Sequence, residues 1–161
     1  MAALDNPAVQ QVLKHVSLSE EQAEIFVNFL RPKKLDKKEL LLTPGKIATD
    51  AAFIVNGCLR SFQIDENGHE VVLQFAPSNW WIADNYSMIA QQPNRISIEA
   101  LEASEVLLLS REDQLKLFDL VTPFERYFRI ISENALVAHQ QLVMDNLALT
   151  AQERYIKFCR R

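Results

Sequence analysis

The residue types that most often carry catalytic chemistry are few in this chain, and their spacing does not group them. His15, His69 and His139 are dispersed, so no two imidazoles share one helix face as a metal site would require. Cys58 and Cys159 form no CxxC pair and have no neighbouring histidine cluster, which is typical of reduced thiols. Nucleophile-elbow, zinc-protease, phosphate-loop and dinucleotide-binding motifs are missing from the sequence. We therefore expect no catalytic residue, no metal and no cofactor, and a protein that is not an enzyme.

Two other groups of side chains could bind ligands. The basic segments 31–38 and 154–161 could contact a phosphate backbone. A solvated surface is the simpler interpretation of both segments, and more so for segment 31–38. Trp80 and Trp81 are adjacent, so a strand would point them to opposite faces. One of them could line a ligand pocket, while at least one should pack in the core. The basic residues are Arg31, Lys33, Lys34, Lys37 and Lys38 in the first segment and Arg154, Lys157, Arg160 and Arg161 in the second.

Length and composition describe the protein that must position these groups. The chain has 161 residues, 48% of them hydrophobic, so one domain can bury a core without a disulfide or a metal. The net charge of -4 argues against non-specific nucleic-acid binding by the whole body. No apolar run approaches the ~20 residues of a membrane span, and Met1–Val12 lacks a signal-peptide pattern. We expect a cytoplasmic protein without membrane contacts.

Helical and β-type patterns follow one another along the chain. Ser19 predicts a helix start, with Gln22 closing a capping box, and Pro32 ends that helix. From about residue 36 to residue 110, short apolar strands alternate with turns. The pair Asn67-Gly68 predicts a hairpin, because both residues tolerate positive φ. Asp84 predicts the N-cap of a short helix inserted between two strands. Together these signals indicate a mainly β fold, a jelly roll or barrel, with flanking helices.

A long helix is predicted after the strands. Pro123 stands at a favoured first-turn position, and the residues after it follow a strict 4-3-4-3 spacing typical of a coiled-coil seam. The same helix could instead pack on its own β-domain. Because Ile130, Val137 and Val143 give it a second apolar face, it could also make both contacts at once. We expect a parallel homodimer through this helix. The predicted dimer seam consists of Phe124, Phe128, Ile131, Ala135, Ala138, Leu142, Asp145 and Leu149.

The order of these elements resembles the cyclic-nucleotide-binding fold, and specific segments narrow the resemblance to bacterial transcription regulators of the Crp/Fnr superfamily. Residues 53–60 resemble that family's strand–glycine–strand segment, and residues 67–76 its next hairpin. Residues 102–113 resemble its last strand and the helix after it. Residues 149–156 resemble the junction that leads into its C-terminal helix-turn-helix. The resemblance implies a cyclic-nucleotide-binding-type β-roll, which is a jelly roll, with N-terminal helices and a long C-terminal dimerisation helix.

The resemblance also implies a domain organisation. Residues 1–121 form the β-roll sensor domain with its N-terminal helices, residues 122–149 the dimerisation helix, and residues 150–161 the start of a truncated helix-turn-helix domain. A complete helix-turn-helix would need ~40 or more residues after Arg161 to place a recognition helix in the major groove. We therefore expect a fragment of a regulator that contacts DNA only through a C-terminal domain absent from this sequence.

The phosphate-binding segment departs from the family pattern. Members that bind cyclic AMP open the inserted helix with Gly-Glu and place Arg-Ser or Arg-Thr later in the segment. Here Ala83 and Asp84 stand at the first pair, and Asn94 and Arg95 at the second. Arg95 could neutralise a phosphate and Asp84 could accept from a ribose hydroxyl, but Ala83 adds a methyl where backbone must approach closely. The simpler interpretation makes Asp84 a helix cap and Arg95 a surface charge.

The register of the second pair decides which residue reaches the pocket. One residue of offset in a strand turns a side chain to the opposite face. If the register follows the match at residues 102–106, Asn94 and not Arg95 points inward, so we predict weak or no cyclic AMP binding. His139 and Gln140 lie on the long helix where family members contact the purine, although both could face solvent or the partner helix.

The resemblance implies the effector-sensing and dimerisation portion of a transcription regulator. Effector binding would shift the packing of the long helices and so reorient the DNA-binding domains. One alternative is a ligand-free interaction module that keeps the fold but has lost the pocket. Another is a cupin-like metalloenzyme, which would need an inward cluster of histidine and carboxylate ligands that three scattered histidines do not supply.

Overall fold

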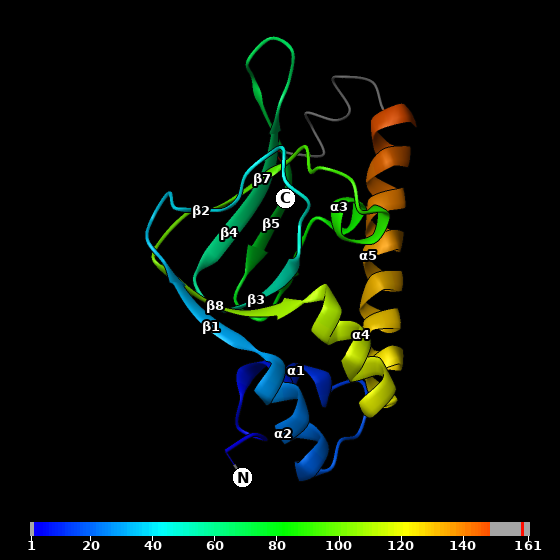
Figure 1. The fold of residues 1–161 in the computed structure, drawn as a ribbon. Helices are drawn as coiled ribbons and strands as arrows, with labels where there is room; N and C mark the ends of the chain where they lie inside the picture. Colours follow the sequence, from blue (N-terminus) through cyan, green and yellow to red (C-terminus); the bar gives the residue numbers. More distant parts are fainter. Residues whose placement is uncertain (1, 149–158, 160–161) are drawn as a thin grey trace.

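The computed structural model describes residues 2–148 and residue 159, and eight strands in that part of the chain form two antiparallel sheets (Figure 1). The strand order is β1-β8-β3-β6 in one sheet and β2-β7-β4-β5 in the other. This arrangement confirms the mainly β fold with flanking helices that the sequence predicted. The strands are β1 (Arg31–Leu35), β2 (Leu40–Leu42), β3 (Asp50–Asn56), β4 (Cys58–Ile64), β5 (Glu70–Pro77), β6 (Trp81–Ile82), β7 (Ser97–Ala100) and β8 (Ser104–Ser110).

The two sheets enclose an apolar interior because alternate residues of each strand point inward. In β4, Leu59 stands opposite Ala76 of β5 and Ala100 of β7, and all three are fully buried. Ile54 of β3 and Val106 of β8 contribute to the same core from the other sheet. The alternation of apolar and polar residues along these strands therefore decides which face of each sheet points into the interior of the roll.

Five helices flank the roll in the described part of the chain, and three of them start where the sequence predicted. The Ser19 hydroxyl accepts from the Gln22 amide at 3.1 Å, and the Gln22 side chain accepts from the Ser19 amide at 2.9 Å, so the capping box is present. The long helix begins at Pro123, as predicted. No helix in the described part of the chain combines the length and the apolarity that crossing a membrane would need. The helices are α1 (Pro7–Val12), α2 (Glu20–Phe29), α3 (Asn85–Ala90), α4 (Arg111–Leu120) and α5 (Pro123–Ala148).

A second core lies between the outer face of one sheet and the helices. Phe53 of β3 and Leu109 of β8 pack there against Phe26 of α2 and Phe124 of α5. The rings of Phe26 and Phe124 have centroids 4.5 Å apart. Figure 1 shows α1, α2 and α4 gathered at one end of the roll, while α5 runs from that end along its side. This core fixes the start of α5 to the body.

The first strand begins earlier than the sequence predicted. The basic segment 31–38 was expected to precede the strands, which were placed from about residue 36, but β1 already begins at Arg31. Pro32 lies inside β1, where its ring removes one backbone donor. An end strand tolerates this loss because one of its edges needs no sheet partner, and β1 is an end strand. The segment was not predicted as a strand because its composition is mostly polar.

The β4–β5 hairpin is present, but its turn differs from the expected one. Only Gly68 adopts positive φ, at 83°, whereas Asn67 does not. The Gly68 amide donates to the Asp65 carbonyl at 3.0 Å, and the Asp65 amide donates to the His69 carbonyl at 2.9 Å. This geometry is a three-residue loop in which the last residue is left-handed, rather than a two-residue turn.

Candidate effector site

The candidate site is built around α3, which connects β6 to β7. Asp84 caps this helix, because its carboxylate accepts from the Ser87 amide at 3.1 Å. Ser87 is fully buried, and its hydroxyl accepts from the Ala48 amide at 2.8 Å and donates to the Gln92 carbonyl at 2.6 Å. The polar side chains at the start of α3 thus tie the helix to the loop before β3. Ser87 and Ala48 carried no pattern in the sequence that would have identified them.

Asn94 holds the segment after α3 against the same loop. Its side-chain oxygen accepts from the Lys46 backbone amide at 2.9 Å, and its backbone amide donates to the Lys46 carbonyl at 2.8 Å. The Gly45 amide in turn donates to the Asn94 carbonyl at 3.0 Å. Asn94 is only 3% exposed, and its Nδ2 is a buried donor without a hydrogen-bond partner among the described residues. A buried unpartnered donor calls for an acceptor, which a ligand or a water can supply.

Arg95 points away from this interior. The residue is exposed, and its guanidinium lies 5.9 Å from the centre of the Tyr86 ring on α3. Asn94 is buried and Arg95 is exposed, and both precede β7, which begins only at Ser97, so the strand register proposed for them stays a prediction. Whether either residue binds an effector stays a prediction, as does the ribose contact expected of Asp84 beside Ala83.

The two tryptophans separate as predicted. Trp80 is 54% exposed, whereas Trp81 packs its ring against Phe53 at 5.3 Å and against Phe128 of α5 at 5.6 Å. The indole N–H of Trp81 donates to the Tyr127 hydroxyl at 2.9 Å. Burial raises the pKa of Tyr127, and the hydrogen bond from Trp81 opposes that shift. This contact joins the strand that leads into α3 to the long helix. Tyr127 was not among the residues predicted for the site, although it lies three residues after Phe124 on the same helix.

The structure divides the predicted dimer seam. Phe124 and Phe128 are buried in their own subunit, and Ile131 is partly buried against the same core. From Ser132 to Met144 every side chain is exposed, which includes the seam residues Ala135, Ala138 and Leu142. The seam residue Asp145 is partly buried, and Leu149 and the expected helix-turn-helix start at residues 150–158 and 160–161 lie outside the described residues. The first half of the seam is therefore an intramolecular contact, and only its second half is available to a partner.

His139 and Gln140 are both exposed on the second half of α5. They lie beyond Ile131, after which α5 leaves the core, so the purine contact that the resemblance implies for them stays a prediction. Among the described residues, no group of three or more His, Cys, Asp or Glu side chains could hold a metal ion.

Comparisons with known proteins agree with this architecture. Residues 17–120, more than half of the chain, match the family model of the cyclic nucleotide-binding domain. No curated protein sequence matches the chain significantly.

Similar solved structures come from several bacteria. The catabolite activator protein of Thermus thermophilus superposes with a TM-score of 0.71 at 18% identity, over 86% of this chain and 63% of that one. A cyclic nucleotide-binding domain from Methylobacillus flagellatus gives 0.72 at 18% identity, over 87% of this chain and 80% of that one. The c-di-GMP responsive global regulator CLP of Xanthomonas campestris gives 0.72 at 14% identity, over 88% of this chain and 71% of that one.

At these identities the structural likeness concerns the fold, and the chain spans less than two thirds of the Thermus protein. The fold predicted from the resemblance is confirmed, since the family model and the superposed structures share it. With its β-roll, its inserted helix α3 and the match over residues 17–120, this chain belongs to the cyclic nucleotide-binding domain family.

Proposed function

We propose that this chain is the effector-sensing and dimerisation portion of a Crp/Fnr-type transcription regulator and that it does not respond to cyclic AMP. Membership of the cyclic nucleotide-binding domain family and the regulators among its structural neighbours support a regulatory rather than an enzymatic role. DNA contact would belong to a helix-turn-helix domain, and the chain alone, with a net charge of -4, should not recognise a DNA sequence.

The orientation of Asn94 and Arg95 carries the proposal on the effector. A cyclic phosphate is best held by a guanidinium, which neutralises it and donates two hydrogen bonds. Arg95 faces solvent, while Asn94 faces the interior and offers one unpartnered amide donor without charge. The missing charge-assisted contact is worth roughly 1.5–3 kcal/mol, which weakens binding by about tenfold to more than a hundredfold. The site suits an uncharged acceptor group better than a phosphate.

The route from this site to α5 runs through Trp81. Its strand leads directly into Asp84 and α3, and its indole donates to Tyr127 on α5. A change in the position of α3 would therefore act on the packing of Trp81 against α5. In a homodimer formed through the exposed half of α5, such a change would shift the relative orientation of the two long helices.

Calorimetric titration of the chain with cyclic AMP tests the proposal. We expect no binding with micromolar affinity, and Arg95→Ala should leave the result unchanged. Micromolar affinity that disappears in Arg95→Ala would contradict the proposal, because Arg95 would then reach the ligand. For any nucleotide or metabolite that does bind, Asn94→Asp is the informative variant, since it keeps the oxygen that accepts from Lys46 and removes the amide donor.

A ligand-free interaction module is the second candidate. The internal hydrogen bonds of Asp84 and Ser87 favour it, because these groups are already satisfied within the chain. A thermal-denaturation screen with nucleotides and small anions distinguishes the two functions. A sensor should be stabilised by at least one compound as binding shifts the folding equilibrium, whereas a ligand-free module should respond to none.

A further inference from the structure

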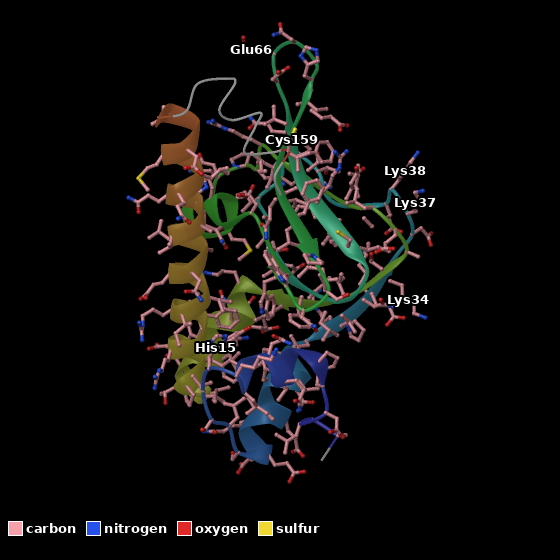
Figure 2. All side chains as sticks on the ribbon, turned by 180° about the vertical axis from the view of Figure 1, so that it is seen from behind. His15, Lys34, Lys37, Lys38, Glu66 and Cys159 are labelled. Carbon is pink, nitrogen blue, oxygen red and sulfur yellow. The ribbon has the colours of Figure 1, made fainter. Side chains whose placement is uncertain are left out.

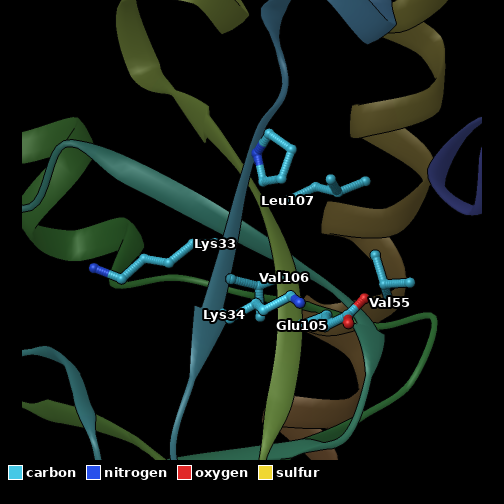
Figure 3. Close-up of a pocket in the computed structure, with 7 residues that line it drawn as sticks. Lys33, Lys34, Val55, Glu105, Val106 and Leu107 are labelled. Atoms are coloured by element: carbon cyan, nitrogen blue, oxygen red, sulfur yellow. The ribbon is translucent and has the colours of Figure 1, made fainter.

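A groove on the outer face of the β1–β8 pair lies outside the candidate effector site. Its volume is about 300 Å³, and its lining shares no residue with α3 or its flanks. Pro32, Val55 and Leu107 contribute its apolar side chains, and Lys34 and Glu105 lie beside them. Figure 3 shows Val55, Glu105 and Leu107 on one side of β1, with Lys33 extending from the other.

The strand register explains how the groove forms. Pro32 stands opposite Leu107, and Lys34 stands opposite Glu105, so alternate residues of both strands line one face. The groove lies over the outer face of β8, with β1 on one side of it and Val55 of β3 on the other. An extended peptide laid along such a groove points alternate side chains toward its floor.

The charge of this strand differs in sign from the charge of the whole chain. Segment 31–38 holds five of the 17 Lys and Arg residues and one acidic residue, while the net charge of the chain is -4. Arg31 pairs with Asp50 at 2.5 Å. By contrast, Lys33, Lys34, Lys37 and Lys38 are exposed and form no ion pair with any residue that the structure describes. Figure 2 shows Lys34, Lys37 and Lys38 along the same side of the molecule.

We propose that this groove binds an extended acidic segment of a partner protein, which places an apolar side chain between Pro32, Val55 and Leu107. Complementary charge brings the segment to the four lysines, and the apolar pocket selects its register. A nucleic-acid backbone fits less well, because an apolar floor offers nothing to a phosphate. The proposal does not depend on the effector site.

The test measures fluorescence anisotropy of a labelled peptide of about eight residues that alternates Asp or Glu with Leu or Val. The whole chain should bind this peptide, and the affinity should fall with added salt. Lys34→Glu, which reverses a charge at the groove, should weaken binding by at least about tenfold. Lys14→Glu reverses a charge that is also exposed, after α1, and serves as the matched control, with circular dichroism checking that both variants fold.

Any of three results would overturn the proposal. Equal losses in Lys34→Glu and Lys14→Glu would show that the peptide responds to overall charge rather than to the groove. Unchanged affinity after all Leu and Val of the peptide are replaced by Ser would show that the apolar pocket is not used. Displacement of the peptide by duplex DNA that carries the same total negative charge would assign the surface to nucleic acid instead. Loss of binding on both the lysine reversal and the peptide replacement supports the proposal.

Discussion

The two halves of α5 have similar apolar periodicity but different surroundings. Over residues 124–131 the apolar side chains pack against the body, with Phe124 fully buried and Tyr127 almost so. Over residues 132–144 every side chain is exposed, including Val137 at 61% and Leu142 at 44%. A 4-3 spacing therefore predicts an apolar stripe on a helix but not which surface covers the stripe.

The exposed half in fact carries two apolar stripes. Leu142 continues the line of the buried residues and belongs to the predicted seam. Val137 lies on a different face of the helix, because it is five residues before Leu142 and five residues correspond to about 140° of rotation. Met144 is seven residues, about two turns, after Val137 and therefore lies on the same face as Val137. Single monomers rarely leave so many large apolar side chains in contact with water, so the exposed half is the part of α5 that a partner would cover. The exposed large apolar residues of this half are Leu136, Val137, Leu142, Val143, Met144 and Leu147.

The largest expected effect concerns the buried half. Phe124→Ala should lower the free energy of unfolding by about 3–5 kcal/mol, because it removes a fully buried ring that packs on Phe26. Leu136→Ala in the exposed half is the control and should change the stability of the subunit by less than about 1 kcal/mol. Urea denaturation at low protein concentration measures both. Similar losses in the two variants would remove the distinction between the halves.

The next effect concerns assembly. Leu142→Glu or Ala138→Glu should convert the proposed dimer to monomers by placing a carboxylate in the seam of each subunit, a loss of about 2–3 kcal/mol per dimer. Analytical ultracentrifugation at micromolar concentration measures the change. Val137→Glu is the matched variant on the other stripe and should leave the dimer intact. If Val137→Glu dissociates it and Leu142→Glu does not, the partner covers the second stripe, and a monomeric wild-type chain would end the dimer proposal.

A smaller effect is expected at the contact between α5 and the strand before α3. Tyr127→Phe removes the hydroxyl that accepts from the Trp81 indole at 2.9 Å and should cost about 1 kcal/mol of stability. Tyr86→Phe, at an exposed position on α3, should have no measurable effect. Chemical denaturation followed by tryptophan fluorescence reports both stability and the surroundings of Trp81. An unchanged stability in Tyr127→Phe would argue against a structural role for this hydrogen bond.

The smallest effect is a dependence on alkaline pH. Burial raises the pKa of Tyr127 in the folded protein, while the unfolded chain ionises near its ordinary value of about 10. Below that pH both states carry the proton, and the contribution to stability is complete. As the pH rises above it, the unfolded state loses its proton first, so the folded state loses relative stability. Denaturation midpoints between neutral pH and alkaline pH should therefore fall more steeply for the wild type than for Tyr127→Phe.

The candidate site could be predicted in part from local patterns. The cap at Asp84 depends on a carboxylate just before a helix, a rule that acts over a few residues and can be applied to the sequence alone. The burial of Asn94 instead accompanies its hydrogen bonds to Lys46, 48 residues away. The contact from Ser87 to Ala48 spans 39 residues and could not be predicted in the same way, because no local rule brings two such segments together.

By itself, the sequence determined the helix starts at Ser19, Asp84 and Pro123 and the hairpin at Gly68, since short-range hydrogen bonding decides these features, whereas the β-roll was predicted from the family resemblance. Only the tertiary structure decided where each element finds its partner. A strand forms at Pro32, although the segment is polar, because β8 pairs with it. Only the first half of α5 is buried, because α2 and the sheet pack against that half. These outcomes depend on contacts between residues far apart in the chain, whose free energy exceeds local preference but leaves no signature in the local sequence.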